Sequence, residues 1–183
     1  ALNLPRNLLP TLVDHTWMAL AQVNLMACRA YSRLRLKKAM PWWSANGPMD
    51  ADMLSGCCLF LRREVVEEMG QLMDPRYPLY YEDTDLFRTL KSLGYRLVHQ
   101  GASRVLHHWS RSTGLVGSGD SEAMRRYVVS QKQYYTKFYG RLGAAWIAFV
   151  NGALAKCPDS WHNRAMFPME DLGDFFEPVE VQL

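Results

Sequence analysis

The chain has 183 residues, of which 49% are hydrophobic, 12% aromatic and 21% charged. This composition supports one domain with a real core and excludes a disordered chain, and a net charge of +3 is too small to indicate a nucleic-acid partner. No apolar run reaches the length of a membrane span and no signal peptide is visible. The four cysteines fit neither a disulfide framework nor a zinc site, so we expect reduced thiols and a cytoplasmic protein.

The N-terminal part is predicted to be a helix followed by a loop rich in Pro and Trp. Thr11 or Asp14 can cap a helix that runs to about Lys38, with apolar residues at helical spacing. Five bases and no acid lie within residues 21–40, which indicates either the basic end of a packing helix or a patch that faces phosphates or anionic lipid. In the loop, Trp43 and the tryptophan before it either stack on a sugar ring or fill the edge of a core.

The next segment, 53–61, is apolar and is predicted to be a buried strand. Within it, Ser55 and Gly56 leave room for the close approach of a ligand or of another backbone. Just before it, Asp50 and Asp52 spell a literal D-x-D, the pattern that binds metal in many sugar-transferring enzymes. That pattern normally ends a hydrophobic strand, whereas here it precedes one, so we interpret this D-x-D as unrelated to metal.

An acidic helix is the most informative stretch. Three carboxylates fall within four residues, before an apolar series at helical spacing that ends at Gly94. They are Glu82, Asp83 and Asp85. Asp83 or Thr84 is predicted to cap the helix, and a carboxylate at the positive end of a helix stays ionised with a fixed direction, which suits a general base. Ordinary capping explains the same acids, and Asp85 with Arg88 is predicted to be a structural pair.

Two short strands are predicted at 95–98 and 104–106, and two adjacent histidines follow, His107 and His108. The loop 109–120 is rich in Gly and Ser. Its hydroxyls, backbone amides and arginine suit a diphosphate, with Arg111 and Ser112 as the candidates, although a plain linker has the same composition. Helices are predicted at 121–139 and at 144–155. The second is apolar and either packs on the domain or lies on a membrane surface. The acidic segment after it is predicted to be loose.

Taken in order, these pieces resemble the C-terminal half of the catalytic domain of family 2 glycosyltransferases, the inverting GT-A enzymes. The resemblance covers about residues 52–140 and rests on an ordered set of motifs, each weak alone. The motifs are Ser55-Gly56 before Arg62-Arg63-Glu64, the helix Glu82-Asp83-Thr84-Asp85-Leu86-Phe87-Arg88, the segment Gly94-Tyr95-Arg96-Leu97-Val98, the histidine after a short strand, and the helix end Tyr134-Tyr135-Thr136-Lys137.

The resemblance implies a role for each candidate residue. Asp83 is the catalytic base that takes a proton from the acceptor hydroxyl, and Glu82 holds the acceptor or orients the base. Ser55 and Gly56 lie beside the acceptor and the donor sugar. His107, with His108 as the rival, helps to hold a divalent metal, Mn²⁺ or Mg²⁺, on the diphosphate of a nucleotide-sugar donor. The loop with Arg111 and Ser112 closes over that donor.

The fold class expected is α/β, a partial GT-A-like domain. Residues 49–140 are expected to form a small mixed sheet of three or four strands covered by helices, with 1–48 and 141–183 as helical extensions. No β-α-β series precedes Met53, so we expect the nucleotide-binding half to be missing and the isolated chain to be inactive. The acceptor is expected to be a glycan or a lipid-linked sugar.

Two other functions stay open at this point. The chain could be a non-catalytic interaction domain that kept the scaffold and lost the donor site. It could also be a metal hydrolase that uses Asp83, Asp85 and the two histidines, although it lacks a ligand spacing such as H-E-x-x-H.

Overall fold

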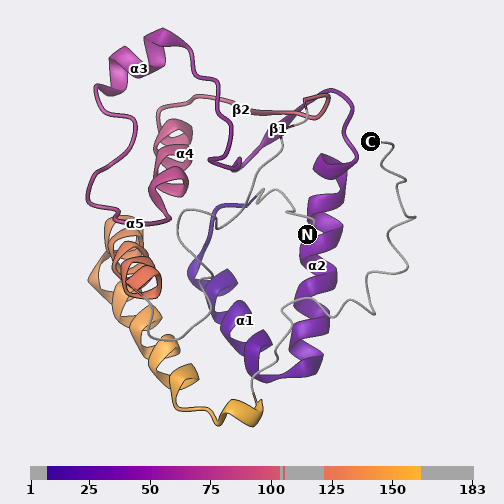
Figure 1. The fold of residues 1–183 in the computed structure, drawn as a ribbon, viewed down its shortest axis with the longest axis vertical. Coiled ribbons are helices and arrows are strands. Elements are labelled where there is room, and N and C mark those ends of the chain that lie inside the picture. The colour runs from indigo at the N-terminus through magenta and orange to yellow at the C-terminus, as the bar shows by residue number, and fades with distance from the viewer. Residues whose placement is uncertain (1–7, 104, 106–121, 162–183) are drawn as a thin grey trace. The chain divides into compact units, whose positions relative to one another are not determined.

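The computed structural model describes residues 8–103, 105 and 122–161, and contacts divide the chain into two units. Unit 1 comprises residues 1–9 and 39–145, and unit 2 comprises 10–38 and 146–183. Helices dominate both (Figure 1). The elements are α1 (Leu12–Val23), α2 (Leu25–Trp43), β1 (Pro48–Ala51), α3 (Arg63–Met69), α4 (Glu82–Ser92), β2 (Leu97–Gln100), α5 (Glu122–Ala155) and a 3-10 turn at Asp159–Trp161.

The sheet of unit 1 is smaller than the sequence predicts. In the described residues it has two strands, β1 and β2, which pair antiparallel with Pro48 opposite Gln100. The prediction of three or four strands is therefore wrong for this part of the chain. Residues 53–61 form turns and irregular chain instead of a strand, and the second predicted strand, 104–106, lies mostly outside the described residues.

The apolar residues of 53–61 enter the core from this irregular chain. Met53 is buried, and Leu54, Leu59 and Leu61 pack against the same cluster. Burial of these side chains therefore does not require a ladder of strand hydrogen bonds. None of the four cysteines, all of which lie in the described residues, forms a disulfide, and Cys57 and Cys58 are exposed rather than inside a strand.

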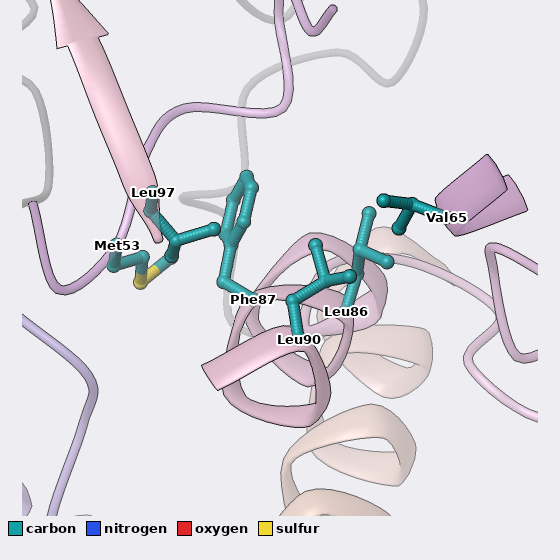
Figure 2. Close-up of a cluster of buried hydrophobic side chains, with 6 residues drawn as sticks. All are labelled: Met53, Val65, Leu86, Phe87, Leu90 and Leu97. Carbon is teal, nitrogen blue, oxygen red and sulfur yellow. The ribbon is translucent and has the colours of Figure 1, made fainter. Parts of the chain in front are cut away.

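The core of unit 1 is built on α4. Six buried side chains form it, and burying each contributes about 1.5–3 kcal/mol. They are Met53, Val65, Leu86, Phe87, Leu90 and Leu97. Figure 2 shows Phe87 directed towards Met53 and Leu97, and Leu86 towards Val65 on α3. The apolar series read from the sequence is thus the face that fixes α4 in unit 1.

Glycines follow both short helices of unit 1, and the one at Gly94 is predicted from the sequence. Gly70 follows α3 with φ 63° and Gly94 follows α4 with φ 86°. At the end of α4, the N–H of Gly94 donates to the carbonyl of Lys91 and the N–H of Tyr95 donates to that of Leu90, both at 3.0 Å. This pair of bonds is a Schellman motif, which satisfies carbonyls that the helix itself leaves unpaired.

Unit 2 begins with α1, which is capped by Thr11 as predicted: the hydroxyl accepts a hydrogen bond from the N–H of Asp14 at 3.0 Å. The single helix predicted to about Lys38 is wrong, because Asn24 divides it. The N–H of Asn24 donates to the carbonyl of Leu20, and its side chain accepts from the N–H of Ala27. One residue therefore ends α1 and caps α2.

The other boundaries also differ from the sequence prediction. The Trp-rich segment predicted as a loop is helical as far as Trp43, with Pro41 inside α2. The two helices predicted at 121–139 and 144–155 are one element, α5, interrupted at Gly140 with φ 69° and ψ −174°. Among the residues that the structure describes, no helix is long and apolar enough to cross a membrane.

Candidate functional site

Asp83 lies in the first turn of α4, partly buried, with its carboxylate held by three hydrogen bonds. Oδ1 accepts from the N–H of Thr84 at 2.7 Å and from the Thr84 hydroxyl at 3.2 Å. Oδ2 accepts from the N–H of Gly56 at 3.3 Å. Because a carboxylate offers about four acceptor positions, these bonds fix its direction and leave capacity for one more donor, such as a substrate hydroxyl.

The contact with Gly56 joins two segments that are 27 positions apart in the sequence. A Cβ at position 56 would lie 3.0 Å from Oδ2 and 3.1 Å from Cβ of Asp83, closer than ordinary van der Waals contact. The glycine here therefore permits close approach of the backbone to Asp83 and does not serve a positive φ. The exposed turn 56–58 and the start of α4 consequently form one small site around Gly56 and Asp83, and the half-buried Ser55 directly precedes it.

The backbone just before the acids is strained. Tyr80 and Tyr81 have φ values of 59° and 66°, the left-handed region, and no other non-glycine residue in the described part of the chain has a positive φ. Such a conformation costs about 1–2 kcal/mol per residue, so surrounding contacts must hold it in place. Tyr81 then takes the N-cap position, since its carbonyl accepts the first helical hydrogen bond from the N–H of Asp85 at 2.8 Å. The predicted cap at Asp83 or Thr84 is wrong.

Buried contacts with α5 hold the strained pair. The Tyr81 ring is 5% exposed and its centroid lies 5.2 Å from that of Tyr134. Its hydroxyl is within 3.4 Å of the Tyr127 hydroxyl and accepts from Gln131 Nε2 at 3.3 Å. On the other side of the pair, the N–H of Leu79 donates to the Ser130 hydroxyl at 3.3 Å. The turn that presents Glu82 and Asp83 is thus anchored at both ends.

Glu82 differs from Asp83 in its surroundings. Its Oε2 is buried and has no hydrogen-bond partner among the described residues. Burial, and to a smaller degree the neighbouring Asp83 carboxylate, raises the pKa of Glu82 above its ordinary value. Compared with an exposed glutamate, this environment favours the protonated form of Glu82, which can donate a hydrogen bond as well as accept one.

Asp85 does not pair with Arg88 as predicted. Its side chain is 7% exposed and accepts hydrogen bonds from Lys137 at 2.7 Å and from the Tyr77 hydroxyl at 3.0 Å. Arg88 instead lies over aromatic rings of α5, with Cζ 4.3 Å from the Phe138 centroid. Asp83 and Asp85 therefore contact different neighbours, and Asp85 links α4 to α5. A hydrolase that used both Asp83 and Asp85 on one metal is not favoured by this arrangement.

The D-x-D carboxylates are engaged in ion pairs at the sheet. Asp50 accepts from Arg96 at 2.8 Å, and Asp52 pairs with Lys91. Trp43 lies at the end of α2 and is 40% exposed. The described residues contain no group of three His, Cys, Asp or Glu side chains that could hold a metal ion. The described residues alone therefore do not provide a site for the divalent metal that the sequence predicts.

Several predicted site residues fall outside the described part of the chain. These are His107, His108, Arg111 and Ser112. Their roles as metal ligand and as donor-binding residues, and the roles of Ser55, Glu82 and Trp43 toward a substrate, stay predictions.

Sequence reasoning missed the residues that position the site. Neither the left-handed turn at Tyr80 and Tyr81 nor its anchors Tyr127 and Gln131 have a local sequence signal, because no glycine or asparagine marks the turn. The one available hint was an aromatic pair directly before an acidic pair.

Comparison with known proteins gives one partial similarity. Over 61 residues the chain is 43% identical to an N-acetylglucosaminyl-diphospho-decaprenol L-rhamnosyltransferase of Mycobacterium tuberculosis, with the same values for the proteins of strains CDC 1551 / Oshkosh and ATCC 25618 / H37Rv. The matched segment is 33% of this chain and 20% of the relative, so it spans about a fifth of the length of these proteins. No family model and no solved structure matches the chain. The similarity supports a glycosyltransferase origin.

Proposed function

We propose that this chain supplies the acceptor side of a glycosyl transfer that inverts the anomeric centre, with Asp83 as the general base, in an enzyme of the family 2, GT-A type. The observation that carries the proposal is the carboxylate of Asp83, which is held by the N–H of Thr84 on α4 and by the N–H of Gly56 in the exposed turn 56–58. The similarity to a rhamnosyltransferase supports the same class of reaction.

The proposed step uses the free acceptor capacity of Asp83. The carboxylate removes the proton of the acceptor hydroxyl while that oxygen forms a bond to the anomeric carbon of the donor sugar. The bond from this carbon to the nucleoside diphosphate breaks on the opposite face, so the configuration inverts and the diphosphate leaves with the electron pair. The fixed direction of Asp83 matters because a base must lie within hydrogen-bond reach of the proton that it removes.

Glu82 is proposed to hold the acceptor. Its Oε2 has no hydrogen-bond partner among the described residues, and we propose that this carboxyl group bonds one sugar hydroxyl while Asp83 accepts from another. The strained turn at Tyr80 and Tyr81 then determines how the two carboxyl groups are presented together. Backbone strain of this kind is concentrated at functional sites in proteins, which favours a catalytic over a purely structural origin of the turn.

A divalent metal on the donor diphosphate remains part of the proposal through His107, with His108 as the rival ligand. When bound, such an ion would neutralise charge on the leaving group. The described residues do not form its site, and the steps assigned above to Asp83 and Glu82 do not depend on it.

The substrates are proposed from the relative. A nucleotide-activated L-rhamnose is the donor that the name of the relative suggests, and an N-acetylglucosaminyl-diphospho-polyprenol is the acceptor. The non-catalytic alternative is not favoured, because the similarity is to an enzyme and the carboxylate of the proposed base is oriented.

The test uses a water-soluble N-acetylglucosaminyl-diphospho-lipid with a short chain. Saturation-transfer NMR should show its sugar protons binding to the isolated chain, without transfer. In the longest form of the protein that is active, incubation with nucleotide-activated L-rhamnose should give a disaccharide in which the anomeric configuration is opposite to that of the donor. Absence of both binding and transfer would refute the proposal.

A further inference from the structure

We propose that Gln131 of α5 is a positioning residue for the transfer reaction, because it holds the left-handed turn that presents Asp83 through the hydroxyl of Tyr81. This inference rests on the proposed function of Asp83 and extends it to a residue that touches no substrate. Gln131 is 2% exposed, so its side chain is not accessible to a sugar. Its effect on the reaction is therefore transmitted through the residues that it contacts.

The side-chain amide of Gln131 donates to two buried or half-buried hydroxyl groups. Its Nε2 lies 3.3 Å from the hydroxyl of Tyr81, in the turn before α4, and 3.4 Å from that of Tyr127, one turn earlier on α5. These two hydroxyls are 3.4 Å apart. The three polar groups thus satisfy one another in a place where an unpaired polar group would cost about 1–3 kcal/mol.

The backbone of Tyr81 is the part of the molecule that this network holds. Tyr81 has φ 66°, a conformation that glycine adopts readily and that costs tyrosine about 1–2 kcal/mol. A glycine would make the same turn with less strain, but it would have neither the ring nor the hydroxyl. The tyrosine therefore suits a turn whose direction is set by contacts with α5 rather than by the local backbone.

Asp83 lies two positions after Tyr81. The carbonyl of Tyr81 accepts the first hydrogen bond of α4 from the N–H of Asp85 at 2.8 Å, so the orientation of Tyr81 sets the start of the helix. Oδ2 of Asp83 then accepts from the N–H of Gly56 at 3.3 Å, the longest of the three hydrogen bonds of this carboxylate. A bond of this length tolerates little displacement, so a loosened turn would break it first.

The packing of α4 on α5 does not depend on Gln131. Further along α4, Asp85 pairs with Lys137 at 2.7 Å, and Arg88 donates to the Tyr134 hydroxyl at 3.0 Å. These contacts remain when the amide of Gln131 is removed. Its loss should therefore free the turn before α4 while the helix itself stays in place.

The first test observes the contact between Gly56 and Asp83 by NMR in the full chain. The signal of an amide proton that is bound to a carboxylate follows the protonation of that carboxylate, so the Gly56 signal should shift with pH in the wild type. In Gln131→Met this shift should fall about twofold or more, and Tyr81→Phe, which removes the same bond from its other end, should have the same effect. Gln133→Met changes a half-buried glutamine of the same helix and should leave the shift as it is.

The second test measures glycosyl transfer in the longest form of the protein that is active. A displaced base slows the chemical step more than it weakens binding, so kcat should fall about tenfold in Gln131→Met and in Tyr81→Phe while KM changes less than about twofold. Because both changes break one bond, the double variant should be no slower than about half the rate of the slower single variant. A purely structural role would reduce the yield of folded protein and leave kcat per folded molecule unchanged.

Thermal unfolding, followed by circular dichroism, checks that the variants are folded. If Gln131→Met does not fold, Tyr81→Phe, which keeps the ring, serves for both tests. An unchanged Gly56 signal or an unchanged kcat in the folded variants would overturn the role of Gln131. Asp83→Asn separates that outcome from a failure of the proposed function. If Asp83→Asn transfers at the wild-type rate, the base is wrongly assigned, whereas a slow Asp83→Asn beside a fast Gln131→Met refutes only the role of Gln131.

Discussion

Adding a single methyl group at Gly56 should slow the reaction without unfolding the protein. The new Cβ of Gly56→Ala would lie 3.0 Å from Oδ2 of Asp83, where ordinary contact begins at 3.4 Å. The carboxylate must therefore shift by a few tenths of an ångström. A shift of 1 Å can cost about 100-fold in rate, so we expect kcat for glycosyl transfer to fall about tenfold.

The same change should have a small effect on stability. Gly56 has no positive φ, so alanine can adopt its backbone conformation. The lower entropy of the unfolded chain then favours folding by about 0.4–1 kcal/mol, which offsets the crowding against Asp83. The free energy of unfolding, measured with urea, should change by less than about 1 kcal/mol.

The assay is the initial rate of transfer to the acceptor proposed above, in the longest form of the protein that is active. Gly47→Ala is the matched control, because a Cβ there has nothing within 4 Å. A Gly56→Ala protein that is folded and has the kcat of the wild type would refute the claim that this glycine positions the base. A loss of several kcal/mol of stability would show a structural role instead.

Three further changes test the packing. Lys137→Met leaves the buried carboxylate of Asp85 without its ion pair and should lower the free energy of unfolding by about 2 kcal/mol. Gly101→Ala places a Cβ 2.2 Å from the carbonyl oxygen of Ala45 and should cost about 2–3 kcal/mol. Burial lowers the pKa of His15 in the folded protein. The unfolded chain therefore binds a proton more readily, and stability should fall by up to about 1.4 kcal/mol between pH 7.5 and 5.5.

Each of these three changes has its own control. Lys132→Met, at an exposed position of α5, should change the free energy of unfolding by less than about 0.5 kcal/mol. If Lys137→Met changes the free energy of unfolding as little as Lys132→Met, the ion pair of Asp85 with Lys137 does not stabilise the fold. Gly47→Ala should be tolerated, and equal stability of Gly101→Ala would mean that β2 does not approach Ala45 closely. His15→Gln should reduce the pH dependence, and an unchanged dependence would assign it to another group.

The sequence was most informative where the chain uses local chemistry. A hydroxyl before an apolar series indicates the cap at Thr11, and a glycine indicates the end of α4. Each signal depends on a single residue and its own backbone, so it can be read without knowledge of the fold.

Predictions failed where tertiary contacts decide the structure. The apolar run 53–61 looked like a strand, but apolarity over so short a run does not distinguish a strand from irregular chain that packs on α4. The spacing of three residues predicts an ion pair between Asp85 and Arg88. In the structure Asp85 instead pairs with Lys137, 52 positions away. No local rule would have found that partner.

The candidate site contains both residues that the sequence predicts and a conformation that it does not predict. Two separate motifs predict Gly56 and Asp83 as site residues, and the structure places these residues in contact. The turn that aims Asp83 depends on two left-handed tyrosines buried against α5, a conformation that only the packed fold explains.

The most direct test of the central claim is the single-turnover rate of glycosyl transfer in Asp83→Asn, with Asp52→Asn as the matched control. Asparagine keeps the shape of the side chain but cannot take a proton. The account predicts that the rate falls at least about 100-fold while the affinity for the acceptor, measured by titration calorimetry, changes little. A rate in Asp83→Asn equal to that of the wild type and of Asp52→Asn would show that Asp83 is not the base.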